Sequence, residues 1–264
     1  MDTSSATSAA REAGNSRVVE YGARVGFAIL GVLHLLIGYI ALKVAWGKGG
    51  GSKQADSSGA LKTLASSSTG SIVLWIGVVG FALLAVWSIT EGIARRQDKT
   101  DLTKLLSKGV LYAFFAWTTF KIVALGQSSS SEKQTEGFAA SLMGNTGGRL
   151  LVGVIGLVVL GVAGYHIYKG WAKKFLEDLE GNPGEWAVRA GRVGYVAKGI
   201  ALVVVGFFFV YAAWTADPKK TQGLDGALKT LKEAPGGPVI LTLVALGLAA
   251  YGVYSFARAK YAKL

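Results

Sequence analysis

The sequence predicts an all-α, polytopic membrane protein with six transmembrane helices, arranged as three tandem helical hairpins. An apolar composition, six long apolar segments and an internal repeat support this prediction. Of the 264 residues, 51% are hydrophobic and 17% are charged, whereas about 25% are charged in typical soluble domains. The 37 glycines and only 4 prolines suit closely packed membrane helices.

Six segments have the length and composition of transmembrane helices, since crossing a bilayer takes about 20 consecutive, mostly apolar residues. They are Val25–Trp46, Ile72–Ile93, Leu105–Leu125, Leu150–Trp171, Val193–Trp214 and Pro238–Ala257. Tryptophans end three of them, as is typical of the membrane–water interface. Buried helices of a large soluble protein are the weaker interpretation, because such proteins rarely contain even one segment of this kind.

Basic residues predict the orientation, because cytoplasmic flanks are rich in Lys and Arg. Of the 28 basic residues, 17 flank the ends on the side of the two chain termini. We therefore expect both termini in the cytoplasm. The net charge of +12 is then expected to meet anionic lipid head groups on the cytoplasmic side rather than nucleic acid. Residues 1–20 are small and polar and are predicted to form a disordered tail, with no cleavable signal peptide.

An internal repeat organises the chain. Gly59–Leu64 (Gly-Ala-Leu-Lys-Thr-Leu) recurs as Gly226–Leu231, and the middle copy has Gly137–Leu142 at the matching place. Twenty-eight residues after each first glycine comes an aromatic residue, namely Trp87, Tyr165 and Tyr254. The predicted hairpin repeats are residues 21–95, 102–174 and 186–260. Two spans per copy keep all copies in one orientation, so the simplest arrangement has a pseudo-threefold axis along the membrane normal.

Each outward loop of the repeat carries a short amphipathic segment, in which apolar residues such as Leu61, Phe138 and Leu228 recur. Such a segment either lies flat at the outer membrane interface or folds over its hairpin as a cap. The sequence leaves both alternatives open.

A second motif places a basic residue before a glycine in the first helix of a copy. It is Lys108-Gly109 in the second copy and Lys198-Gly199 in the third, whereas the first copy has Leu30-Gly31. Together with the loop segment, this pattern resembles the bacterial membrane family known as domain of unknown function 1206, common in actinobacteria, over residues 21–259. The resemblance implies six spans in a bacterial plasma membrane and brings no established activity.

Both histidines of the chain fall in predicted spans, where ionisable residues are candidate functional sites. A haem held by His34 and His166 is the sharpest hypothesis, but depth argues against it. His34 lies ten residues from Arg24, about 15 Å along a helix, and His166 lies three residues from Lys169, about 5 Å. We therefore expect no cofactor, and each histidine to bond to a neighbouring helix or to interfacial water.

One position is polar in the second helix of every copy, where Ser88, His166 and Ser255 are repeat equivalents. If these faces converge, they form a polar ring along the axis. The alternative is bonding of the serine hydroxyls to their own helix backbone.

Lys108 and Lys198 occupy the same place near the cytoplasmic ends of their spans. They either extend toward lipid phosphates without specificity or form a specific site for an anionic lipid or solute.

Catalysis finds little support, because the chain has no cysteine and no cluster of histidines or carboxylates within a span. We therefore expect no enzyme and no metal site. The preferred function is a non-catalytic accessory or scaffold component that binds lipid or a larger membrane complex. The alternatives are a passive channel or transporter for a small solute or ion along the pseudo-threefold axis, and a haem or quinone redox protein.

Overall fold

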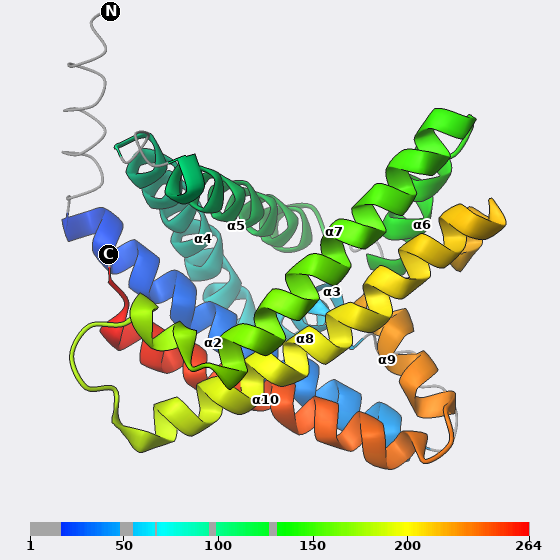
Figure 1. The fold of residues 1–264 in the computed structure, drawn as a ribbon. Helices are drawn as coiled ribbons and strands as arrows, with labels where there is room; N and C mark the ends of the chain where they lie inside the picture. Colours follow the sequence, from blue (N-terminus) through cyan, green and yellow to red (C-terminus); the bar gives the residue numbers. More distant parts are fainter. Residues whose placement is uncertain (1–16, 48–54, 67, 95–98, 127–130, 264) are drawn as a thin grey trace, which may run out of the picture. The chain divides into compact units, whose positions relative to one another are not determined.

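The structure, a computed structural model, describes residues 17–47, 55–66, 68–94, 99–126 and 131–263. Its α-helices (Figure 1) are α2 (Arg17–Trp46), α3 (Ser57–Ala65), α4 (Ser68–Ala94), α5 (Lys99–Leu125), α6 (Ser131–Leu142), α7 (Thr146–Trp171), α8 (Gly184–Thr215), α9 (Leu224–Glu233) and α10 (Gly237–Tyr261). The short 3-10 helices η1 (Lys174–Asp178) and η2 (Pro218–Lys220) lie between them. These residues form no strand, which confirms the all-α fold class.

Six of the helices are long and apolar enough to cross a membrane, which confirms the six predicted spans. They are Glu20–Trp46, Gly70–Ala94, Lys99–Leu125, Thr146–Trp171, Gly184–Thr215 and Gly237–Tyr261. Each contains the segment predicted from the sequence and is longer than it. The helices extend further because backbone hydrogen bonding continues into turns that are too polar to count as hydrocarbon-spanning.

Residues 17–20 of the predicted N-terminal tail belong to α2, which begins at Arg17. An ion pair of 2.8 Å between Glu20 and Arg24, four residues apart, supports this first part of the helix. Residues 1–16 of the predicted tail lie outside the described residues.

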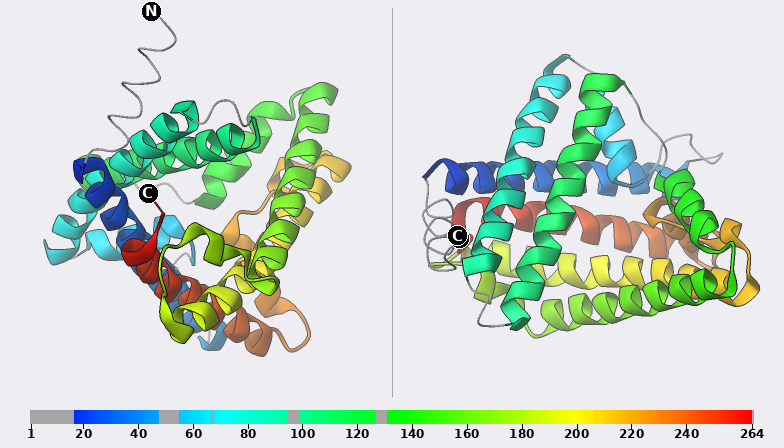
Figure 2. Two further views of the ribbon diagram at one scale, coloured as in Figure 1. Left: turned by 60° about the vertical axis from the view of Figure 1, so that its left-hand side comes forward. Right: turned by 90° about the horizontal axis from the view of Figure 1, so that it is seen from above.

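The chain divides into two compact units. Unit one comprises residues 1–30, 61–128 and 255–264, and unit two comprises residues 31–60 and 129–254. Within unit one α4 and α5 lie side by side, and within unit two α7 and α8 do so (Figures 1 and 2). The pseudo-threefold axis inferred from the repeat stays a prediction.

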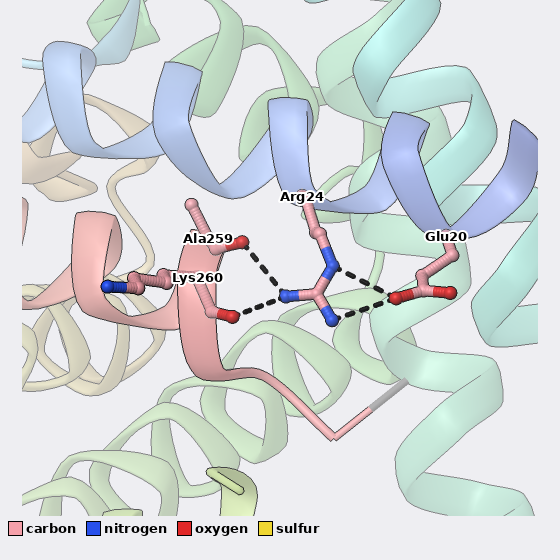
Figure 3. A network of polar contacts seen from close by, with 4 residues as sticks. All are labelled: Glu20, Arg24, Ala259 and Lys260. Carbon is pink, nitrogen blue, oxygen red and sulfur yellow. Dashed lines mark hydrogen bonds and ion pairs between the residues drawn. The ribbon is translucent and has the colours of Figure 1, made fainter. Parts of the chain in front are cut away.

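Basic side chains cap the carboxyl ends of three helices. In unit one Arg24 donates hydrogen bonds to the carbonyl oxygens of Ala259 (3.2 Å) and Lys260 (2.5 Å) at the end of α10 (Figure 3). In unit two Arg149 donates to the Trp214 carbonyl oxygen at 2.8 Å, and Lys232 donates to that of Gly47 at 3.1 Å. The last carbonyl groups of a helix lack partners within it and carry partial negative charge. These three basic residues therefore stabilise helix ends.

The amphipathic loop segments are the helices α3, α6 and α9. Leu61 and Leu228, on α3 and α9, are fully buried, so these two helices act as folded caps. The middle copy differs, because Phe138 of α6 stands where the other copies have alanine and is 51% exposed. The neighbouring Ala139 takes the buried position instead.

Candidate functional site

Glycines on α8 let two helices of unit two approach it closely. On one side, a Cβ at Gly199 would lie 2.6 Å from the Ile167 side chain of α7 and 2.8 Å from the Ala163 carbonyl oxygen. On another side, a Cβ at Gly194 would lie 2.5 Å from the Cα of Tyr251 on α10. Larger side chains would hold both neighbours away, so the glycines permit this packing.

Tyr195 points between these two neighbouring helices, because it follows Gly194 by about 100° around α8. Its buried ring lies 5.6 Å from the ring of His166 on α7 and 5.2 Å from that of Tyr251 on α10, centroid to centroid. Tyr254 and Phe175 complete the group around it, at 5.5 and 5.6 Å. We call the whole assembly the aromatic–basic cluster; its members are His34, His166, Lys169, Phe175, Asp178, Tyr195, Lys198, Tyr251 and Tyr254.

Both histidines belong to this cluster, although their rings do not contact each other directly in it. The His34 ring lies 4.7 Å from the ring of Tyr251, and Tyr251 contacts Tyr195, which contacts His166. Two tyrosine rings connect the imidazoles, and this geometry gives a shared haem no support.

The cluster carries an excess of positive charge. Lys169 forms an ion pair of 2.6 Å with Asp178, and its ammonium group lies 5.4 Å from the Tyr195 ring centre. Lys198 is half-buried, with its ammonium group 4.3 Å from the Tyr251 ring centre. Among the residues that the structure describes, Lys198 has no carboxylate within ion-pair distance. Its charge is therefore compensated only by the electrons of an aromatic ring.

A short strap closes one end of the cluster. It is η1, in which the fully buried Phe175 packs edge-on against Tyr254 at 5.1 Å. The Tyr254 hydroxyl donates a hydrogen bond of 3.1 Å to the Phe175 carbonyl oxygen. These contacts hold Asp178, the last residue of the strap, beside Lys169.

The other predicted site residues lie in unit one. Lys108 is half-buried on α5, and the side chains of Ser88 and Ser255 are almost fully buried on α4 and α10. Ser88 and Ser255 thus belong to one unit and His166 to the other. The polar ring stays a prediction from the repeat.

The loops contain a second charged group, which sequence reasoning missed. Asp225, at the start of α9, accepts a hydrogen bond of 2.7 Å from the Ala55 backbone amide and pairs with Lys229 at 2.7 Å. Asp56 accepts a bond of 2.8 Å from the Gly59 amide at the start of α3. We call Asp56, Asp225 and Lys229 the acidic cap. Both carboxylates are almost fully buried, which a polar, glycine-rich loop sequence does not indicate.

Charge around Lys229 raises its pKa. Burial acts to lower the pKa, but the hydrogen bond and charge of Asp225, with the charges of Glu132 and Asp56, outweigh it. The cap thus holds two buried carboxylates and one lysine, which pairs with Asp225. Within the described parts of the chain, no three His, Cys, Asp or Glu side chains gather as a metal site.

Sequence reasoning did not predict several members of the aromatic–basic cluster as site residues, among them Phe175, Asp178, Tyr195 and Tyr251. Tyr254 was visible as a repeat aromatic. Asp178 carries no such signal, because it lies in a connection outside the repeated segments.

Comparisons with known proteins agree with the repeat. The family model described as Domain of Unknown Function (DUF1206) matches residues 25–95, 103–173 and 193–262. This match confirms the resemblance and its three-repeat architecture. A relative in Bacillus subtilis (strain 168), described as Uncharacterized protein YxxB, is 28% identical over 250 residues, covering 90% of this chain and 89% of the relative. No solved structure matches the chain.

Proposed function

We propose that this chain, which belongs to the DUF1206 family through all three of its repeats, is a non-catalytic membrane scaffold that binds an anionic lipid head group. The binding site is the aromatic–basic cluster. The single observation that carries the proposal is Lys198, a half-buried cation without a carboxylate partner among the described residues.

A charge in this position is unfavourable unless a ligand compensates it. Partial burial of a charged lysine costs desolvation free energy, and no carboxylate within ion-pair distance among the described residues offsets this cost for Lys198. The ring of Tyr251 offsets part of this cost. A lipid phosphate beside Lys198 would offset more, and the membrane itself supplies such groups.

Two tyrosines of α7 favour a head group over a free solute. Tyr165 and Tyr168, on the same helix as His166, are about half exposed. Tyrosines with an apolar ring and a polar hydroxyl are enriched at the head-group level of bilayers. A lipid reaching the cluster from the side would therefore contact apolar surface with its chains and Lys198 with its phosphate.

The proposed location is a bacterial plasma membrane, with the termini and the aromatic–basic cluster on the cytoplasmic side. The supporting observation is the distribution of basic residues, 17 of 28 on that side. The three capping residues refine this count. Arg24 belongs to the proposed cytoplasmic side, and Arg149 and Lys232 to the opposite one, so discounting all three strengthens the bias.

The test compares Lys198→Gln with Lys43→Gln. Lys43 also lies over a tyrosine ring, that of Tyr39 at 4.7 Å, but it is exposed and belongs to no cluster. Both variants lose one charge and one cation–ring contact. The measurement is lipid binding by native mass spectrometry, with protein in nanodiscs of neutral lipid titrated with phosphatidylglycerol.

We expect Lys198→Gln to weaken binding about fivefold, since one lysine near a lipid surface contributes about 1 kcal/mol. Lys43→Gln should leave binding within twofold of the original chain. Equal effects of the two substitutions would contradict the proposal, because they would indicate nonspecific attraction.

The channel alternative and the redox alternative stay predictions from the sequence. A Soret band in the purified protein would favour the haem hypothesis over lipid binding.

A further inference from the structure

Resting on the lipid site proposed above, we infer that Asp178 sets the charge of that site and thereby its lipid preference. With Asp178 in place, the site accepts a singly charged glycerol phosphodiester and disfavours a doubly charged phosphomonoester. Phosphatidylglycerol represents the first class and phosphatidic acid the second.

The charges of the cluster lead to this inference. The Lys169 side chain is only 11% exposed, and its ammonium group lies 2.6 Å from the Asp178 carboxylate. This pair is electrically neutral, which leaves Lys198 as the uncompensated charge of the cluster. One net positive charge matches a phosphodiester, whereas a phosphomonoester carries about −1.5 to −2 at pH 7.

Lys198 lies close to the level of His166 on the neighbouring helix. Gly199, the next residue on α8, packs between Ala163 and Ile167 of α7, and these two residues flank His166 along the helix. One ligand can therefore contact both side chains.

His166 offers a group that a glycerol hydroxyl would satisfy. Its Nδ1 lies 2.9 Å from the Val162 carbonyl oxygen, so in the neutral imidazole Nδ1 carries the proton and Nε2 is an acceptor. Among the described residues, Nε2 has no hydrogen-bond partner. A glycerol hydroxyl can donate to this nitrogen, whereas the ionised oxygens of a phosphate cannot.

Asp178 is positioned independently of its ion pair, which makes its charge separable from its structural effect. Phe175 and the Tyr254 hydroxyl hold the strap. The adjacent Glu177 also pairs with a lysine, Lys174 at 2.9 Å, but both side chains are largely exposed to solvent. Glu177 is therefore a matched control, with the same charge on the same strap and outside the cluster.

The experiment measures binding of phosphatidylglycerol and phosphatidic acid to the full chain in neutral nanodiscs at pH 7. Asp178→Asn removes the competing carboxylate, and we expect phosphatidic acid to bind at least about fivefold more tightly, as a freed buried charge acts strongly at short range. Lys169→Gln breaks the same ion pair but leaves the carboxylate, and both lipids should bind more weakly. Glu177→Gln should leave the ratio of the two affinities unchanged.

The affinity for phosphatidic acid is expected to rise in Asp178→Asn and to fall in Lys169→Gln. If the ion pair only stabilised the fold, both substitutions would change the affinity in the same direction. If Asp178→Asn and Lys169→Gln shift the affinities alike, or if Glu177→Gln acts like Asp178→Asn, the inference about Asp178 is wrong. Should Asp178→Asn not fold, the ratio of the two affinities in Lys169→Gln decides, because electrostatics predicts a larger loss for the doubly charged phosphatidic acid and a structural role predicts equal losses. If Lys198→Gln leaves binding unchanged, the lipid site itself is wrong, and this outcome is distinguishable from the others.

Discussion

The aromatic–basic cluster and the acidic cap are both charged groups of unit two, yet their charges are satisfied in different ways. In the cap, Asp225 and Asp56 each accept a backbone amide bond, and Lys229 compensates Asp225. In the cluster, Lys169 is matched by Asp178, but Lys198 has only a tyrosine ring. Each carboxylate of the cap thus has a backbone donor within the protein.

This difference separates a structural charge from a candidate binding charge. A buried polar group that finds its partner within the protein contributes to stability, while one without a full partner indicates a ligand or a functional role. Substitutions in the cap should therefore change stability, and substitutions of Lys198 should change binding.

The largest expected effect is topological and nearly all-or-none. The chain has no cysteine, so single cysteines can report the side of the membrane. In intact cells, a membrane-impermeant thiol reagent should label Lys219→Cys, near the cap, and not Glu180→Cys, beside the strap. Labelling of both from outside would contradict the proposed orientation.

Gly194→Val should disrupt the cluster. The added Cβ would lie 2.5 Å from the Tyr251 backbone, and overpacking of this kind costs about 1–3 kcal/mol or more. We expect a lower melting temperature and loss of lipid binding together. Gly161→Ala is the control, because nothing lies within 4 Å of the new Cβ, and this variant should be as stable as the original chain or more so.

Asp225→Ala should destabilise the cap without changing lipid selectivity. It leaves the Ala55 amide and Lys229 without their partner, and hydrogen bonds to charged groups contribute about 1.5–3 kcal/mol. Thermal unfolding in detergent measures the effect, with Glu185→Ala as an exposed ion-pair control. A change in the preference between the two lipids would show that the two groups are coupled.

The smallest effect concerns pH. The folded state raises the pKa of Lys229 above its ordinary value of 10.5, so it binds the proton more tightly than the unfolded state does. Its contribution to stability is full below pH 10.5 and is lost as the pH rises through the folded-state pKa. The melting-temperature advantage of the original chain over Lys229→Met should therefore persist at pH 8 and shrink above pH 10.5.

The sequence identified several residues of the aromatic–basic cluster but did not predict how they are arranged. Lys198, His34 and His166 stood out because ionisable residues are rare in apolar segments. Their proximity was not predictable, since it depends on which faces of α2, α7, α8 and α10 meet. Asp178 and Asp225 were missed, because a carboxylate in a loop usually lies in solvent and no local pattern marks its burial.

The loop helices also show which features the sequence predicted and which depended on packing. The recurring Gly-Ala-Leu pattern indicated an amphipathic segment in each copy, and each copy has a helix there. Whether its apolar face contacts the bilayer or the protein was open. Packing decided it for Leu61 and Leu228, which are buried, whereas Phe138 of the middle copy stays exposed.

The sequence alone determined the six spans, the three repeats and the family, because helix length, apolarity and recurrence are local properties along the chain. Only the tertiary structure placed Lys198, His166 and His34 around Tyr195 and Tyr251, and brought Asp178 to Lys169. The physical reason is that contacts between helices depend on close packing at positions such as Gly194 and Gly199. The sequence shows that these positions are glycines, but it does not show which helix packs against them.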